Sequence, residues 1–119
     1  MRGRSLLPVL ALVPLCLGLA PAAGKELPKA ADQLLWCGSA YYWLSNDAND
    51  AGNDAEGDRY AGWSDSLMLL AVDALKAAGF VEAEIADAVD ASDDAVVNEL
   101  GTDKARYDIA ACEPLVPFR

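Results

Sequence analysis

The sequence predicts an all-α protein: a small bundle of four helices, closed by one disulfide and preceded by a secretory signal peptide. From residue 28 onward, apolar residues recur at alternating steps of three and four, as the buried face of a helix requires. No stretch of strand length alternates apolar and polar residues, and no internal repeat is visible. At 119 residues the chain has room for a single helical domain, expected over residues 25–119.

Residues 1–24 have the parts of a secretory signal peptide. Arg2 and Arg4 give a basic start, residues 6–19 form an apolar run, and residues 20–22 carry alanines at the spacing that a signal peptidase reads. The run of fourteen is shorter than the roughly 20 residues that span a bilayer, so cleavage is favoured over an anchor. We therefore expect an exported protein, periplasmic or extracellular, that is free of the membrane after cleavage.

The composition excludes several functional classes. The chain has no histidine, which rules out Ser-His-Asp and Cys-His catalytic systems and every His-ligated metal site. Nine Lys and Arg against nineteen Asp and Glu give a formal charge of −10, which argues against nucleic-acid binding because phosphate contacts need clustered basic residues. No nucleophile lies near a base in the sequence, so we expect a non-enzymatic protein without a cofactor.

Removal of the signal peptide leaves two cysteines. Cys16 lies in the apolar run, so only Cys37 and Cys112 remain in the mature chain. An even pair in a short exported chain is typical of one disulfide, because the compartment is oxidising and the core is small. The alternatives are two free thiols or a redox pair, and no Cys-x-x-Cys motif supports a redox pair.

The first helix is expected near residues 28–46. Its apolar face comprises Ala30, Leu34, Cys37, Tyr41, Leu44 and Ala48. Residues 46–58 follow and are rich in Asn, Asp and Gly, which favour turns over helices. The sequence therefore predicts a long solvated loop between the first two helices.

The second helix is expected near residues 59–78, with Asp58 as its N-cap. Its apolar side comprises Tyr60, Trp63, Leu67, Leu70, Ala74 and Ala77. Gly79 is placed to end this helix, because a glycine tolerates the left-handed conformation that follows many helices. Leu75 and Phe80 are placed as the two apolar contacts of such a Schellman ending.

The third helix is expected near residues 82–100, because Glu82 and Glu84 favour the positive end of a helix dipole. The apolar face continues through Ile85, Val89, Val96 and Leu100. Ser92 interrupts this face, so the helix either continues or breaks there, and a break would give the bundle five helices. Gly101 is placed to end it.

The fourth helix is expected near residues 103–112, capped by Thr102 and stopped by Pro114, because the residue before proline avoids the α region. Cys112 lies on its apolar face together with Ala105 and Ile109. Since Cys37 lies on the apolar face of the first helix, a bridge between the two cysteines would pin the first helix to the last.

The predicted loop invites comparison with the twelve-residue calcium loop, because its carboxylates and amides are the oxygen ligands that calcium prefers. Asp47, Asn49 and Asp58 fall at positions one, three and twelve. Position five is Ala51, and position twelve offers Asp in place of the longer Glu that binds calcium bidentately. These three residues are weak calcium candidates, and a solvated loop is the favoured interpretation.

The third helix carries an acidic stripe. Between Lys76 and Lys104 the chain has no Lys or Arg. Asp87, Asp90 and Asp94 fall within about 60° of one another at 100° per residue. The stripe is either a solvated face that keeps an exported protein soluble or a docking surface for a basic partner, whose binding would weaken as salt rises.

Two tryptophans on the first helix allow two interpretations. Trp36 and Trp43 lie seven residues apart and hence almost one above the other. They point more than about 100° away from Cys37 and Tyr41. Either the first helix is buried on two sides, which is the ordinary arrangement in a four-helix domain, or the Trp pair forms an exposed contact patch for a protein, a peptide or a sugar.

Two short stretches, Trp36-Cys37 and Trp43-Leu44, place a Trp just ahead of the first cysteine and an aromatic–Leu pair soon after it. In these stretches, and in its size, helices, export and single disulfide, the chain resembles the small acid-activated periplasmic chaperones. The cysteines here are further apart, lysines are scarcer, and the Asn/Asp/Gly loop has no counterpart in that family. The resemblance implies activation by acid, since protonating nineteen carboxylates would leave the chain strongly positive.

Two functional hypotheses follow. The preferred one is an exported, non-enzymatic helical protein that binds another macromolecule through its aromatic or its acidic face, for instance as the inhibitor of a basic extracytoplasmic enzyme. The alternative is an acid-activated, chaperone-like stress protein of the periplasm.

Processing and pairing are tested together by mass spectrometry of the protein purified from cells without reduction. We expect a mass that lacks the residues up to Ala22 or Gly24 and is two hydrogens lighter than the dithiol form. A mass that retains Met1, or thiols at Cys37 and Cys112 that react with an alkylating reagent, would contradict this prediction.

Overall fold

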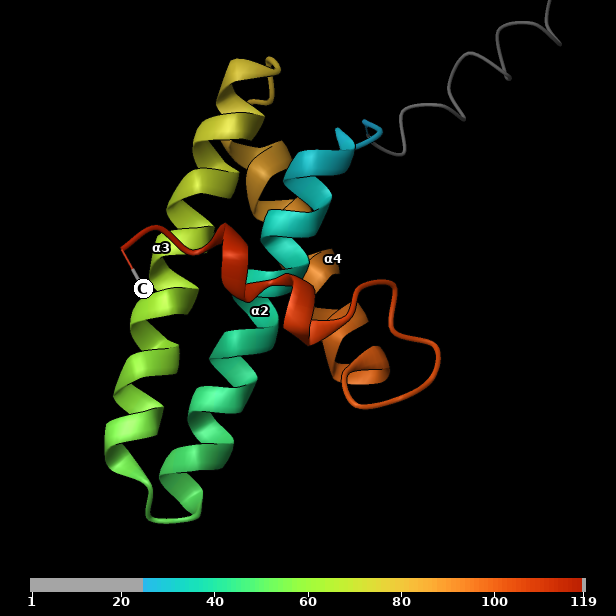
Figure 1. Ribbon diagram of the computed structural model, residues 1–119. Helices are drawn as coiled ribbons and strands as arrows, with labels where there is room; N and C mark the ends of the chain where they lie inside the picture. The colour runs from blue at the N-terminus through green and yellow to red at the C-terminus, as the bar shows by residue number, and fades with distance from the viewer. Residues whose placement is uncertain (1–24, 119) are drawn as a thin grey trace, which may run out of the picture.

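The computed structural model describes residues 25–118, and the predicted signal peptide lies outside the described residues. Three long helices make up most of the domain: α2 (Lys29–Asp50), α3 (Asp54–Ala77) and α4 (Glu82–Glu99). A fourth helical segment, short and bent, consists of two 3-10 turns, η3 (Ile109–Ala111) and η4 (Glu113–Leu115). The predicted all-α fold is confirmed (Figure 1).

α2 lies at the centre of the domain. α3 packs along it, α4 packs on another side, and the C-terminal segment crosses it (Figure 1). One core cluster comprises Trp36, Cys37, Ala40, Tyr41, Leu67, Val96, Cys112 and Val116. The other comprises Ala31, Leu35, Ala71, Leu75, Phe80, Ile85 and Ala88. Both clusters include residues of α2, so this helix is buried on more than one side.

The prediction of a long loop over residues 46–58 is wrong. α2 continues to Asp50 and α3 begins at Asp54, so the connection is a tight turn in which Gly52 adopts a φ of +81°. The two helices approach closely at their joined ends because Ala48 and Gly57 are small and buried. The hydroxyl of Ser45 donates a hydrogen bond to the carbonyl oxygen of Gly57 at 2.9 Å. Apart from Asn53, which precedes α3, the Asn and Asp residues of this stretch belong to α2 and α3 and not to a loop.

The predicted end of the second helix is confirmed. The amide of Phe80 donates to the carbonyl oxygen of Leu75, and the amide of Gly79 donates to that of Lys76, both at 3.0 Å. Gly79 has a φ of +88°, the left-handed conformation of a Schellman motif. Leu75 and Phe80 belong to the same core cluster, so the apolar contact of the motif joins α3 to the start of α4.

α4 is one continuous helix that passes through Ser92, so the alternative of five helices does not apply. At its N-terminus the carboxylate of Glu84 accepts a hydrogen bond from the amide of Val81 at 2.9 Å, which satisfies one free donor of the first turn. Gly101, with a φ of +79°, follows the last turn as predicted.

The prediction of an α-helix over residues 103–112 is wrong, because the only helical turn within this range is η3. Thr102 does not cap a helix: its hydroxyl donates to the carbonyl oxygen of Glu99 at 2.7 Å and accepts from the amide of Lys104 at 3.1 Å. Asp108 instead caps the first 3-10 turn, accepting from the amide of Ala110 at 3.0 Å. A segment of about ten residues is too short to hold an α-helix by itself, so contacts with the other helices decide its conformation.

Cys37 and Cys112 lie at disulfide distance, as predicted. Their sulfurs are 2.04 Å apart and their Cα atoms 5.5 Å apart, and both residues are fully buried. The pair joins the middle of α2 to the bent C-terminal segment, which therefore stays on α2 although it contains no long helix.

Two glycines of the chain should respond in opposite ways to alanine. Gly79→Ala places a side chain in the left-handed region and should lower the free energy of unfolding by about 1–2 kcal/mol. Gly62 lies inside α3, and a Cβ atom there would meet no atom within 4 Å, so Gly62→Ala should raise it by up to about 1 kcal/mol. Denaturant unfolding measures both, and equal effects would contradict the assignment of the α3 end.

Candidate functional site

A groove opens where α2, α3 and α4 meet. It has a volume of about 430 Å³. Its lining comprises Ser39 and Tyr42 of α2, Ser64, Asp65, Met68 and Val72 of α3, and Val89, Asp90 and Asp93 of α4. The groove exists because α3 and α4 both pack on α2 but make few contacts with each other.

The base of the groove is fixed by close packing of α3 on α2. A Cβ atom at Gly38 would lie 3.1 Å from the Cγ of Met68, so glycine there lets the two helices approach. The hydroxyl of Ser64 donates to the carbonyl oxygen of Gly38 at 2.7 Å. A larger residue in place of Gly38 would therefore displace the side chain of Met68.

Asp93 is held in place from α2. The buried hydroxyl of Ser39 donates to its Oδ1 at 2.7 Å, and the indole Nε1 of Trp43 donates to the same oxygen at 2.9 Å. Both donors lie on α2, so these bonds bind α4 to the central helix. The carboxylate is consequently fixed at the edge of the groove.

The groove combines an apolar base with carboxylates along its rim. Met68, Val72 and Val89 supply the apolar part, whereas Asp65 and Asp90 are exposed. Among residues 25–118, no Lys or Arg forms an ion pair with either carboxylate. An ionised carboxylate only accepts hydrogen bonds, so the rim favours a ligand that carries donors or positive charge.

The predicted acidic stripe is divided by the structure. Asp87, Asp90 and Asp94 are all exposed on α4, opposite the buried Ile85 and Val96, as the helical spacing predicts. Of the three, only Asp90 lines the groove. Asp87 and Asp94 lie on the same helix but outside it.

Sequence reasoning missed Asp65 and Asp93. Asp65 was missed because the second helix was expected to bury Leu70 and Ala77, whereas α3 buries Ala71 and Leu75. Asp93 was missed because its partners lie 54 and 50 residues away, and no local pattern indicates such contacts.

The two tryptophans have different environments. Trp36 is 1% exposed and belongs to the core, where its Nε1 donates to the Oε1 of Glu99 at 3.2 Å. This burial removes Trp36 from any contact surface and agrees with a first helix buried on two sides. Trp43 is partly buried and lies at the groove only through its hydrogen bond to Asp93.

The three calcium candidates do not lie in one loop. Asp47 and Asn49 belong to the last turns of α2, and Asp58 belongs to α3. Over the described part of the chain, no group of three or more His, Cys, Asp or Glu side chains could hold a metal ion.

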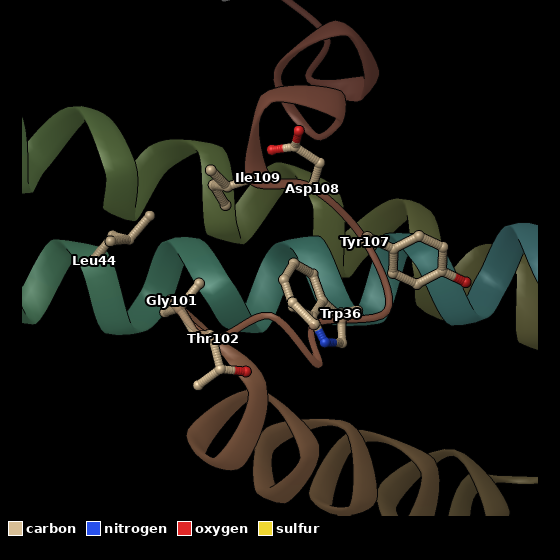
Figure 2. Close-up of a pocket in the computed structure, with 9 residues that line it drawn as sticks. Trp36, Leu44, Gly101, Thr102, Tyr107, Asp108 and Ile109 are labelled. Carbon is tan, nitrogen blue, oxygen red and sulfur yellow. The ribbon is translucent and has the colours of Figure 1, made fainter.

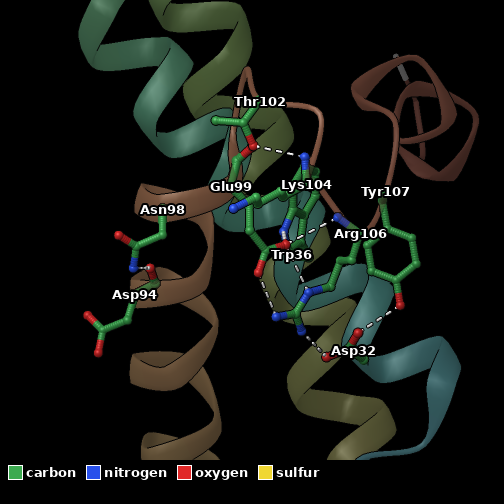
Figure 3. Close-up of polar contacts among 9 residues, drawn as sticks. All are labelled: Asp32, Trp36, Asp94, Asn98, Glu99, Thr102, Lys104, Arg106 and Tyr107. Carbon is green, nitrogen blue, oxygen red and sulfur yellow. Dashed lines mark hydrogen bonds and ion pairs between the residues drawn. The ribbon is translucent and has the colours of Figure 1, made fainter.

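Arg106 ties the segment after α4 to two helices (Figure 3). Its Nη2 lies 2.8 Å from the Oε2 of Glu99, and its Nη1 lies 3.3 Å from the Oδ1 of Asp32 in α2. The hydroxyl of Tyr107 donates to the other oxygen of Asp32 at 2.7 Å. These contacts explain why residues 101–108 remain on α2 without a helix of their own.

The same contacts shift two pKa values. The hydrogen bond from the Arg106 side chain is the main cause that lowers the pKa of Glu99. Burial, followed by the hydrogen bond to Asp32, raises the pKa of Tyr107 to about 12. Glu99 and Tyr107 are therefore ionised and neutral, respectively, at neutral pH.

A second cavity of about 460 Å³ lies beneath the segment after α4 (Figure 2). It is lined by Trp36, Leu44, Leu100, Gly101, Thr102, Ala105, Tyr107, Asp108 and Ile109. The hydroxyl of Thr102 and the carboxylate of Asp108 already accept hydrogen bonds from backbone amides of the same segment. The cavity therefore offers apolar contact with little directional recognition, and we assign no ligand to it.

Comparisons with known protein families, with curated proteins and with solved structures found no match to this chain. Within residues 25–118, none of the helices is both long enough and apolar enough to cross a membrane.

The contact between Glu99 and Arg106 predicts a pH dependence of stability. The lowered pKa of Glu99 means that its contribution is present above the usual value of about 4.3 and is lost as pH falls through the folded-state value. Glu99→Gln should therefore lower the free energy of unfolding at neutral pH, and its difference from wild type should shrink in acid. Denaturant unfolding at a series of pH values measures this difference.

Glu26→Gln is the matched control, because it removes one carboxylate that lies outside the contacts of Arg106. A difference between wild type and Glu99→Gln that stays constant from neutral pH into acid would contradict the role assigned to the Arg106 contact.

Proposed function

We propose that this chain is an exported, non-enzymatic protein that binds a basic protein partner through the groove between α2, α3 and α4. The observation that carries the proposal is the groove itself, in which an apolar base is bordered by Asp65, Asp90 and Asp93 and no Lys or Arg contributes to the lining. Apolar contacts supply affinity at such a site, and the carboxylates select for positive charge.

The charge distribution supports this proposal. The formal charge of the chain is −10, and no Lys or Arg occurs between Lys76 and Lys104. Lys25 pairs with Glu84 and Arg106 pairs with Glu99 at the two ends of α4, whereas within residues 25–118 no ion pair joins Asp87, Asp90 or Asp94 to a Lys or Arg. Such a surface attracts a basic protein over a distance of about one Debye length, roughly 10 Å at 0.1 M salt, and raises its rate of association.

The environment of Ser39 supports a non-enzymatic role. Its hydroxyl donates to the carboxylate of Asp93, an arrangement that could suggest a nucleophile with its base. Ser39 is 1% exposed, however, and the same oxygen of Asp93 also accepts from the indole of Trp43. These bonds hold the carboxylate on the rim and leave the hydroxyl out of reach of a substrate.

An acid-activated chaperone is the second candidate, and one observation favours it. Protonation of Glu99 would release Arg106 from α4, and the segment that carries Arg106 covers the apolar cavity beside Trp36. The pH series described for Glu99→Gln also tests this candidate: a wild-type protein that loses no stability in acid would contradict it.

The basic-partner proposal is tested by affinity capture from an envelope fraction, followed by mass spectrometry. The wild-type chain is compared with the double variant Asp65→Asn/Asp90→Asn, which changes the groove. Asp87→Asn/Asp94→Asn is the control, because it removes the same charge from exposed positions outside the groove.

We expect wild type and control to capture a basic protein that the groove variant binds at least about fivefold more weakly, since two ion pairs contribute about 1 kcal/mol. Salt of about 0.5 M should weaken capture by wild type to about the level of the groove variant, because it screens the rim charges. Equal capture by the two double variants, or capture by wild type that high salt does not weaken, would contradict the proposal.

A further inference from the structure

We infer that the groove receives one face of a basic, amphipathic α-helix of the partner, which completes a four-helix bundle with α2, α3 and α4. This inference rests on the proposed function and names its mode of recognition. It follows from the dimensions of the groove, from the groups that line it and from the backbone that the three helices offer.

The arrangement of the long helices leaves a place for one more. α3 and α4 each pack on the central α2 but barely contact one another. In a four-helix bundle, each helix packs against two neighbours around a shared core. The C-terminal segment packs with Trp36 of α2, Leu67 of α3 and Val96 of α4 in one core cluster. The groove lies elsewhere, because its apolar residues Met68, Val72 and Val89 pack against the other cluster.

The length of the groove matches two turns of helix. On α3 the lining extends from Ser64 to Val72, which is a rise of about 12 Å at 1.5 Å per residue. A helix of the partner would present apolar residues at positions i, i+3, i+4 and i+7 over this length. The volume of about 430 Å³ accommodates a few such side chains, and Met68 can adapt to their shape.

The chemistry of the lining matches two features of a basic amphipathic helix. The base is apolar, and the hydroxyls of Ser39 and Ser64 are already used in hydrogen bonds within the domain. The rim carries Asp65 on the α3 side and Asp90 on the α4 side. The matching helix therefore carries an apolar stripe with Lys or Arg on both of its flanks.

The backbone of the groove argues against an extended peptide as the occupant. Its three walls are helices, whose backbone amides and carbonyls are bonded within each helix. A peptide strand needs a free sheet edge for its main-chain hydrogen bonds, and an all-helical groove offers none. A helix satisfies its own backbone and needs only side-chain contacts.

The test uses two synthetic peptides of about 18 residues and identical composition, built from Leu, Ala and Lys. One places Leu at i, i+3, i+4 and i+7 with Lys on both flanks, and the other has the same residues in scrambled order. Calorimetric titration at low salt measures the affinity of each peptide for the purified protein, and circular dichroism measures the helix gained on binding.

Two exposed side chains provide a matched pair of variants. Tyr42 is 51% exposed and lines the groove, whereas Leu69 is 68% exposed and does not. Tyr42→Ala should weaken binding of the amphipathic peptide several-fold, and Leu69→Ala should leave it unchanged. Both side chains are exposed, so neither truncation endangers the fold.

We expect the amphipathic peptide to bind at least tenfold more tightly than the scrambled one and to gain helix as it binds. Equal affinities for the two peptides, or an effect of Leu69→Ala equal to that of Tyr42→Ala, would overturn the helix inference. Either result leaves the proposed function standing if capture of a basic protein is still lost in Asp65→Asn/Asp90→Asn. Equal capture by the two Asn double variants would instead contradict the proposed function itself.

Discussion

Burial of α2 is the constraint on which the rest of the domain depends. α3, α4 and the C-terminal segment pack around this one helix. Its consecutive residues Cys37, Gly38, Ser39 and Ala40 are small and all buried, and at Gly38 the absence of a side chain leaves room for Met68 of α3. Because α3 and α4 are held apart by a helix that both contact, the groove between them is a direct result of this packing.

Features that depend only on neighbouring residues or on helical spacing could be predicted. The end of α3 at Gly79 depends on one glycine and two apolar neighbours, and the exposure of Asp87, Asp90 and Asp94 depends on helical spacing alone. The all-α fold follows from periodicity, and the pairing of Cys37 with Cys112 follows from a count of two. None of these inferences requires knowledge of which helix packs against which.

Features that depend on tertiary contact could not be predicted. The Asn- and Asp-rich stretch before Asp58 has the composition of a loop, yet buried Ala48 and Gly57 let two helices meet there. The segment around Arg106 has the periodicity of a helix, yet its contacts with α2 and α4 favour turns. The groove likewise depends on Asp93, whose hydrogen-bond donors lie more than 45 residues away. Of the acidic residues that line the groove, only Asp90 was therefore predicted from the sequence.

The position of the cysteine pair sets how much of the domain lies inside one covalent loop. The pair spans 75 residues, and both α3 and α4 lie wholly within that span. In the loop-entropy account, closing a long loop removes more conformational entropy from the unfolded chain than closing a short one. An unfolded chain that keeps this bridge is therefore a closed ring containing two of the three long helices, and α2 is divided between the ring and the segment before Cys37.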